Sequence, residues 1–301
     1  MNSKFETTAF CEPNKETIPE SIIQEGEKRA KEIIAALHLP YHNEKHVQRV
    51  VENYLQIVMA IIGGGTKIDP RMMQIGILAA AFHDSVQNFT ETANDPSGAK
   101  GVIRQRDSGQ NEKSSVLPLF KYMDEENEKV PGTFTEEDKA LAQKMIDVTV
   151  PKFENGVMIQ KNLNETSSEL EIALALADIG TAGMGPSEDF IREGNEIFRE
   201  DNIDIAKAVA ELQTGGSIDD TRKENFRSRM IAWSETQPKF AKSREDRFDT
   251  DTVGLTEKAR HTLKTRVFKH FGRSIELATQ KLEERRGLSF EKLLADMGYG
   301  I

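Results

Sequence analysis

The sequence predicts an all-α protein, a helical bundle that carries additional helices towards its C-terminal end. Apolar residues recur at helical spacing in nearly every segment, and no segment shows a convincing strand pattern. The longest continuous apolar stretches, such as 57–62, are too short to cross a bilayer. With 301 residues, the chain is long enough to build a large core in one big domain or two.

Six helices are expected in the first part of the chain. Pro40 separates the first two, because a proline disfavours the helical conformation of the residue before it. Gly63 to Gly65 ends the second helix, and Asp69 followed by Pro70 is a favourable start for the third. The expected segments are about 20–38, 43–62, 70–84, 111–126, 135–148 and 168–181.

Two polar stretches, 88–109 and 151–167, are expected to be loops. A loop of about twenty residues is uncommon in a compact domain and often has a function. Pro118 predicts a kink or a start in the helix after the first loop. The stretch 135–138, Thr-Glu-Glu-Asp, resembles a capping box, so it predicts the start of the next helix.

The chain changes character after the stretch 183–186. The helices expected there are charged and amphipathic, and they lack His-Asp pairs; they are 187–213, 219–235, 255–271, 273–284 and a short one near 289–297. The stretch 239–252, in which Lys, Arg and Asp alternate, is expected to be a surface connection. We therefore expect two parts, residues 20–182 and a C-terminal helical extension, 183–301, packed on the first.

Charge and cysteine content restrict the possible functions. The formal charge of −10 disfavours nucleic acids and anionic membranes as the main partners, although a local site could still bind an anion. Cys11 is the single cysteine, which excludes an internal disulfide and a zinc site built from cysteines. No apolar signal core follows the first residues, and we expect a cytoplasmic protein.

The pair His83-Asp84 ends an apolar helical run and is the most informative feature of the chain. Buried polar side chains are costly without partners, and a divalent cation is a partner for both. His42 and His46 lie one helical turn apart, and Asp178 lies in another apolar helix. Each group alone could be a hydrogen-bonded or solvated pair without metal. Together, on three apolar helices, they favour a metal site between facing helices.

The order His, then His-Asp, then Asp on a helical chain resembles the HD superfamily of metal-dependent phosphohydrolases. The stretch 41–46, Tyr-His-Asn-x-x-His, is similar to the opening found in cyclic-nucleotide phosphodiesterases and in a bacterial group of short HD phosphohydrolases. The stretch 81–84, Ala-Phe-His-Asp, followed by 111–115, Asn-Glu-Lys-Ser-Ser, resembles the bacterial group more closely. The resemblance covers about 25–182 and implies an HD-domain helical bundle. Residues 186–301 show no such resemblance.

The resemblance also implies roles for individual residues. The positions that match metal ligands are His46, His83, Asp84 and Asp178. Asp84 would be the ligand able to bridge to a second ion. His42 matches the histidine that protonates the leaving oxygen in the phosphodiesterases. Glu112 matches an acid of the Asn-Glu motif, which would hold a water at the metal or close the site.

The sequence departs from the superfamily at two points. The Glu-Asp that follows His-Asp in alarmone hydrolases is replaced by Ser85-Val86, which disfavours an alarmone substrate. No further histidine pair lies between His83 and Asp178, so we expect one ion, or one tight and one loose. The mixed nitrogen and oxygen ligands suit Mn, Fe, Co, Ni or Zn better than Mg alone.

The expected activity is hydrolysis of a phosphomonoester or phosphodiester by a metal-bound water, on a phosphorylated small molecule such as a nucleotide. Candidates for binding the substrate phosphate are Lys45, Arg104, Arg106 and Lys113, with Arg49 also nearby in sequence.

Three other interpretations remain at this stage. A cyclic-nucleotide phosphodiesterase would need a purine-stacking phenylalanine and an amide that reads the base, and the sequence locates neither. An oxidative di-iron enzyme would need extra ligands. A non-catalytic regulator would sense a metal or nucleotide and bind a partner through its C-terminal helices. The oligomeric state stays open.

Overall fold

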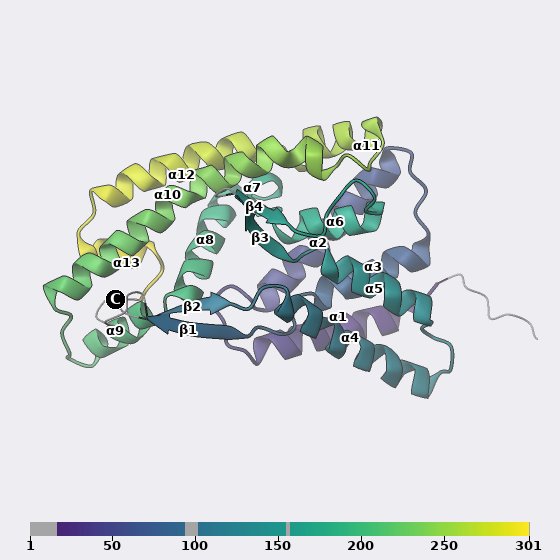
Figure 1. Ribbon diagram of the computed structural model, residues 1–301, viewed down its shortest axis with the longest axis horizontal. Coiled ribbons are helices and arrows are strands. Elements are labelled where there is room, and N and C mark those ends of the chain that lie inside the picture. Colours follow the sequence, from purple (N-terminus) through teal and green to yellow (C-terminus); the bar gives the residue numbers. More distant parts are fainter. Residues whose placement is uncertain (1–16, 94–101, 155–156, 301) are drawn as a thin grey trace, which may run out of the picture.

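The computed structural model describes residues 17–93, 102–154 and 157–300, and helices make up most of this part of the chain. The prediction of an all-α bundle is therefore confirmed. In the first part of the chain the helices are α1 (Glu20–Ala35), α2 (Glu44–Gly63), α3 (Pro70–Phe82), α4 (Gln110–Lys129), α5 (Glu136–Asp147) and α6 (Glu169–Asp178). Figure 1 shows them gathered at one end of an elongated molecule.

Helix α2 and helix α3 form the centre of this bundle. Helix α2 packs against α1, α3 and α6, and α3 packs against α1, α4, α5 and α6. Almost every side chain of α3 after Gln74 is buried, because this helix has neighbours on most sides. The ends of α3 and α6 are therefore fixed by packing rather than by solvent-exposed loops.

Side-chain caps begin these helices, and the sequence predicted those at Asp69 and Thr135. Asn43 accepts hydrogen bonds from the backbone N–H groups of Lys45 and His46 at the start of α2. Asp69 caps α3 in the same way. Thr135 forms a capping box with Asp138 at the start of α5. Pro118 lies inside α4, which begins earlier, at Gln110.

The two polar stretches expected to be loops each contain a hairpin, so the prediction that the chain has no strands was wrong. Strands β1 (Phe89–Ala93) and β2 (Val102–Arg106) pair antiparallel, with Phe89 opposite Arg106. Strands β3 (Pro151–Glu154) and β4 (Val157–Gln160) form a second pair. The strands are only four or five residues long, and the stretches around them are rich in charged and polar residues, so the polar average of each stretch hid the strands.

The C-terminal elements are α7 (Thr181–Met184), α8 (Ser187–Asp201), α9 (Ile203–Gln213), α10 (Asp220–Asp251), α11 (Glu257–Thr262), the π-helical turn η1 (Leu263–Val267), α12 (Phe271–Arg286) and α13 (Phe290–Asp296). Helices α10 and α12 lie antiparallel along one side of the molecule (Figure 1). The expected helix 187–213 is broken at Asn202, and the expected helix 255–271 contains the π turn.

The stretch 239–252 is helical, so its prediction as a surface connection was wrong. It is the second half of α10, which continues past Pro238. The side chains of Ala241, Arg244, Phe248 and Asp251 are buried at helical spacing. This buried stripe explains the helix, because charged residues occupy the remaining positions and dominate the composition.

The largest apolar core crosses from the first helices into the C-terminal ones, where Phe190, Phe248, Phe268 and Phe271 join it. A smaller core lies between α9, α10 and α13, around Phe226, Met230 and Leu294.

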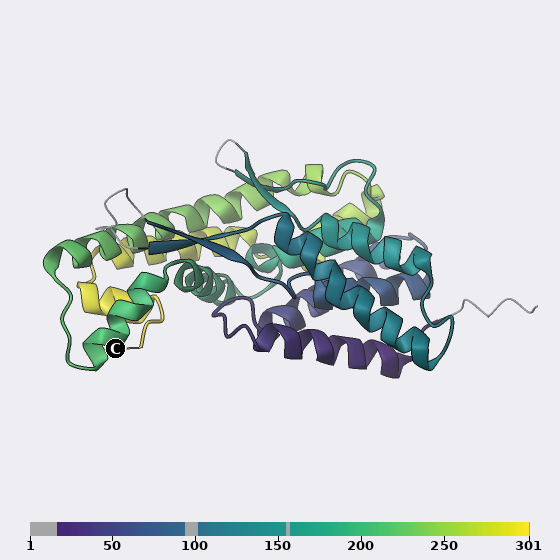
Figure 2. The same ribbon diagram turned by 60° about the horizontal axis from the view of Figure 1, so that its bottom comes forward.

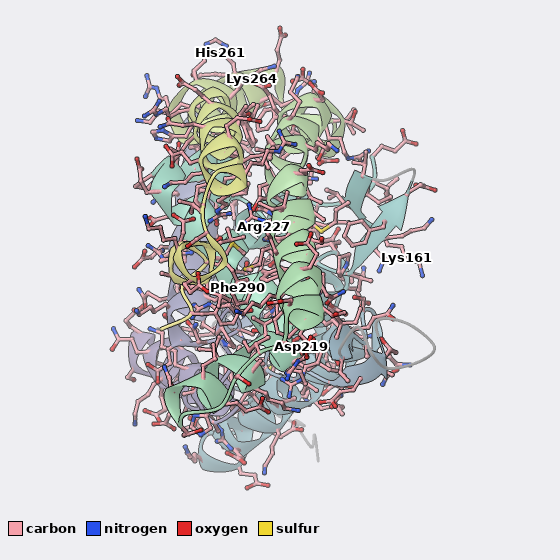
Figure 3. All side chains as sticks on the ribbon, turned by 90° about the vertical axis from the view of Figure 1, so that its left-hand side faces the viewer. Lys161, Asp219, Arg227, His261, Lys264 and Phe290 are labelled. Atoms are coloured by element: carbon pink, nitrogen blue, oxygen red, sulfur yellow. The ribbon has the colours of Figure 1, made fainter. Side chains whose placement is uncertain are left out.

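Polar contacts also hold the C-terminal helices together. Arg285 of α12, almost fully buried, donates hydrogen bonds to Asp296, Ser234 and Asn195. Arg227 of α10 donates to the carbonyl oxygens of Arg286 and Leu288, close to Phe290 at the start of α13 (Figure 3). Along the described residues, no helix combines the length and the apolar character needed to cross a membrane.

Candidate metal centre

Four residues predicted as metal ligands come together in the structure. Each of His46, His83, Asp84 and Asp178 offers one ligand atom, and these atoms all lie within 4.8 Å of one another. His46 is in the first turn of α2, His83 and Asp84 follow the last residue of α3, and Asp178 ends α6. The three helices that the sequence indicated therefore meet at one point.

The ligand atoms face a common centre. Asp84 Oδ2 lies 3.1 Å from His46 Nε2 and 3.0 Å from His83 Nε2. Asp178 Oδ1 lies 3.3 Å from His83 Nε2 and 3.9 Å from His46 Nε2. On the far side of its ring, His83 Nδ1 lies 2.8 Å from the carbonyl oxygen of Ala80. A proton on Nδ1 leaves the lone pair of Nε2 directed at the centre, as metal ligation requires.

Two helix ends add negative potential to this centre. The C-terminal end of a helix carries partial negative charge on its unpaired carbonyl groups, and a cation near it is stabilised. Helix α3 ends immediately before His83, and α6 ends at Asp178. Both ends therefore favour a bound cation.

Fixed negative charge exceeds fixed positive charge around the centre. Four carboxyl groups gather there, those of Asp84, Glu112, Asp178 and Glu200. Among the described residues, the Arg106 guanidinium is the permanent cation that forms ion pairs with this group. A divalent cation would balance much of the remaining charge.

The pKa values of the buried groups reflect the same demand for positive charge. Burial alone would lower the pKa of His83, but the carboxylates of Asp84 and Asp178 outweigh burial and raise that pKa well above its usual range. Burial would raise the pKa of Asp84, but His83 and Arg106 hold it well below its usual range. The Asp84 carboxylate thus stays ionised and can stabilise a cation, so the residues present fit a divalent metal ion.

His42 lies beside the four ligands and is held from the C-terminal part of the chain. Its Nε2 is 3.5 Å from Asp84 Oδ2, and its Nδ1 donates a hydrogen bond to Oε1 of Glu200 on α8. Oε2 of Glu200 accepts the backbone N–H groups of Tyr41 and His42, each at 3.1 Å. Glu200 therefore fixes both the ring and the backbone of the segment before α2.

Arg106 of β2 contacts the centre through the other carboxylate oxygen of Asp84. Its Nη2 pairs with Asp84 Oδ1 and lies 3.3 Å from Glu112 Oε1, and its Nε donates to Gln87 Oε1 at 2.6 Å. Gln87 Nε2 in turn donates to Asp84 Oδ1 at 2.9 Å. Glu112 also accepts the backbone N–H of Gly109 and so begins α4. Glu112 thus acts as a cap and as a partner of Arg106.

The rest of the Asn-Glu-Lys-Ser-Ser motif holds the chain that follows the His-Asp pair. Asn111 exchanges two hydrogen bonds with the backbone of Asn88, at 2.9 and 3.0 Å. Ser115 Oγ accepts the backbone N–H of Val86 at 2.9 Å. These bonds fix the segment that carries Gln87 against α4.

Only part of the set predicted to bind the substrate phosphate lies at the centre. Arg106 contacts it directly. Lys45 and Lys113 are exposed, and Lys113 lies near Asp147 rather than among the ligands. Arg104 pairs with Glu91 at 3.5 Å and lies over the Phe89 ring. In the described part of the chain, no hydrogen bond or ion pair joins these last three cations to the four ligands.

Sequence reasoning missed Glu200 and Gln87. Glu200 is one of several acids in the amphipathic helix α8, and nothing local marks it as the one that turns inward. Gln87 lies close to the His-Asp pair, and an amide three residues after Asp84 was a usable signal.

The chain matches no protein-family model and no curated protein sequence.

Proposed function

We propose that the chain is a metal-dependent phosphohydrolase that cleaves a phosphomonoester or phosphodiester, with a nucleotide as the substrate class to test first. One observation carries the proposal. A cluster that suits a divalent cation lies beside a histidine, His42, whose Nδ1 is held by Glu200 and whose Nε2 faces the cluster. A metal site that is only structural does not need such an oriented histidine. The resemblance to the HD superfamily supports the same activity.

The four ligands would hold one divalent cation. Such a cation supplies a water acidic enough to act as nucleophile near neutral pH, and it neutralises charge on the phosphoryl oxygens. The chain's own residues supply the rest of the chemistry.

His42 would serve as the general acid. The Glu200 carboxylate accepts a hydrogen bond from the N–H group at Nδ1, so Nε2 is the ring atom free to donate a proton to the departing oxygen. The carboxylate also stabilises the protonated ring and prevents it from rotating, as a buried acid does for a catalytic histidine in other hydrolases. The side chain of Glu200 is 2% exposed, which protects this contact from water.

Arg106 would orient the phosphoryl group. Its Nε and Nη2 are occupied by Gln87, Asp84 and Glu112. Among the described residues, its Nη1 has no hydrogen-bond partner, and 22% of the side chain is exposed. An anionic phosphoryl oxygen beside the cation could accept this remaining donor.

Metal analysis combined with hydrolysis assays tests the proposal. Protein prepared without chelator or a histidine tag is analysed for metal, and then assayed with Mn²⁺, Co²⁺ or Mg²⁺ on p-nitrophenyl phosphate, bis(p-nitrophenyl) phosphate, nucleoside monophosphates and cyclic nucleotides. We expect bound metal and phosphate release in the wild type. His42→Ala should keep the metal and lose turnover of the nucleotides, whose leaving oxygen needs a proton, whereas Asp84→Ala should lose both metal and turnover.

The same experiment separates the enzyme from a regulator. A regulator would bind metal and show no turnover on any substrate, and Asp84→Ala would change its stability alone. The position of Glu200 favours the enzyme, because α8 contributes to the centre itself rather than serving only as a partner surface. Absence of both metal and turnover would contradict the proposal.

A further inference from the structure

The two carboxylate oxygens of Asp84 have different partners. Oδ2 faces the three histidine Nε2 atoms, at 3.0 Å from His83, 3.1 Å from His46 and 3.5 Å from His42. Oδ1 faces away from them and pairs with Nη2 of Arg106. A carboxylate that bridges two metal ions uses one oxygen for each ion. Here the second oxygen is already bound to a guanidinium.

The Arg106 guanidinium is held in this place from several sides. Glu112 Oε1 lies 3.3 Å from Nη2, and Gln87 contacts both Asp84 Oδ1 and Arg106 Nε. An arginine guanidinium keeps its proton in proteins. The guanidinium is therefore a permanent cation within the centre.

The fold supports the strand that carries this arginine. Strand β2 packs against α8 and α9, and Figure 2 shows the β1–β2 hairpin reaching from the first helices towards α9. Helix α8 also carries Glu200, the partner of His42. The C-terminal extension thus supports both sides of the centre, and Arg106 is positioned by the fold rather than by a free loop.

We propose that this is a centre for a single metal ion, in which the Arg106 guanidinium occupies the place beside Asp84 Oδ1 that a second divalent ion would otherwise take. The inference rests on the proposed metal centre and concerns how many ions it holds. Removing the guanidinium would leave Asp84 Oδ1 and Glu112 Oε1 facing the same space. Two carboxylate oxygens suit hard cations such as Mn²⁺ or Mg²⁺.

Counting bound Mn²⁺ tests the proposal without any substrate. Equilibrium dialysis with Mn²⁺ and electron paramagnetic resonance are applied to the wild type, Arg106→Ala and Arg106→Lys. We expect one Mn²⁺ per chain in the wild type and in Arg106→Lys, which keeps the positive charge. Arg106→Ala should bind a second Mn²⁺ more weakly, and its spectrum should show the spin coupling of two neighbouring ions. Arg104→Ala, on the same strand, controls for disturbance of the hairpin.

Every outcome of this experiment either supports or contradicts the single-ion proposal. Two tightly bound ions in the wild type would overturn the single-ion proposal and leave the phosphohydrolase proposal intact. A folded Arg106→Ala variant that still binds one ion would also overturn it, and Arg106→Gln serves for the same comparison if the alanine variant does not fold. A wild type that binds no Mn²⁺, Co²⁺ or Zn²⁺ would contradict the metal centre itself, and with it both proposals.

Discussion

Glu200 and His42 form a buried carboxylate–imidazole pair although 158 residues separate them in the sequence. Both side chains are almost fully buried, and the carboxylate also accepts two backbone N–H groups next to the ring. Burial would raise the pKa of Glu200, but His42 and these hydrogen bonds lower it, so the carboxylate stays ionised. The pair joins α8 to the segment that begins α2.

Replacing Glu200 by Gln should weaken proton donation more than substrate binding. Loss of a general acid typically lowers the rate by a factor of about 10² to 10⁴. Loss of the carboxylate that orients this acid should cost part of that factor, and we expect the rate to fall by roughly 10-fold or more. The loss should appear in kcat for nucleotides, whose leaving oxygen needs a proton. It should be small for p-nitrophenyl phosphate, whose leaving group departs as a stable anion.

Glu196→Gln, one turn earlier on α8, is the matched control, since Glu196 pairs with Arg192 at 3.8 Å rather than with His42. An equal loss on both substrates in Glu200→Gln would indicate a structural role instead of an orienting one.

Metal binding should stabilise the folded protein through the four ligands. A ligand that binds only the folded state at 100 times its dissociation constant raises the unfolding free energy by about 2.7 kcal/mol. We expect added Mn²⁺ or Co²⁺ to raise the Tm of the wild type and to have little effect on Asp178→Asn, which loses a charged ligand. Asp147→Asn, at the equivalent last residue of α5, should respond to metal as the wild type does. Equal responses of all three proteins would argue against Asp178 as a ligand.

The sequence was sufficient to predict which four residues come together at the candidate metal centre, but not the residues around them. His83 and Asp84 stand out because polar side chains end an apolar helix, and that contrast is local. Glu200 has no such contrast, because acids are frequent on α8 and its inward direction depends on how α8 packs against distant segments. Long-range packing of this kind leaves no periodic signal in a single sequence.

Charged side chains also hid two elements of the fold from sequence-based prediction. The second half of α10 was hidden because its buried positions include Arg244 and Asp251, which form a buried ion pair and read as surface residues in the sequence. The β1–β2 hairpin was hidden because its few β-branched residues stand among charged and polar ones in a polar stretch. In both cases tertiary contacts stabilise charged side chains that composition alone assigns to solvent.

Asp201 should make stability depend on pH. Burial, and then the charge of Glu200, raise the pKa of Asp201 to about 7 from an ordinary value near 3.8. The folded protein therefore binds this proton more tightly than the unfolded chain, and the stability associated with Asp201 falls as pH rises from about 4 to about 7. The fall is about 1.4 kcal/mol of unfolding free energy for each pH unit at most.

The Asp201→Asn variant has no ionisable side chain at this position. Its unfolding free energy relative to that of the wild type, measured by urea titration, should therefore increase between pH 5 and pH 8. Asp246→Asn, at an exposed position on α10, controls for the loss of one negative charge. A constant difference between Asp201→Asn and the wild type across this range would show that Asp201 ionises freely in the fold.

The distance between α2 and α3 should determine how tightly the candidate centre binds metal. A Cβ at Gly76 of α3 would lie 1.8 Å from Tyr54 Oη and 2.4 Å from Tyr54 Cζ, on α2. Both Gly76 and Tyr54 are buried, so Gly76→Ala must push the helices apart, at a cost of about 1–3 kcal/mol in unfolding free energy. Because His46 lies on α2 and His83 at the end of α3, the same shift should weaken Mn²⁺ binding.

Gly63→Ala is the matched control for this substitution. Gly63 ends α2, and a Cβ there would meet no atom within 4 Å. Without a clash, alanine should raise the unfolding free energy by about 0.5–1 kcal/mol through its better helix propensity, and leave Mn²⁺ affinity unchanged. If Gly76→Ala lowered stability but bound Mn²⁺ as tightly as the wild type, the close contact of the two helices would not set the distance between His46 and His83.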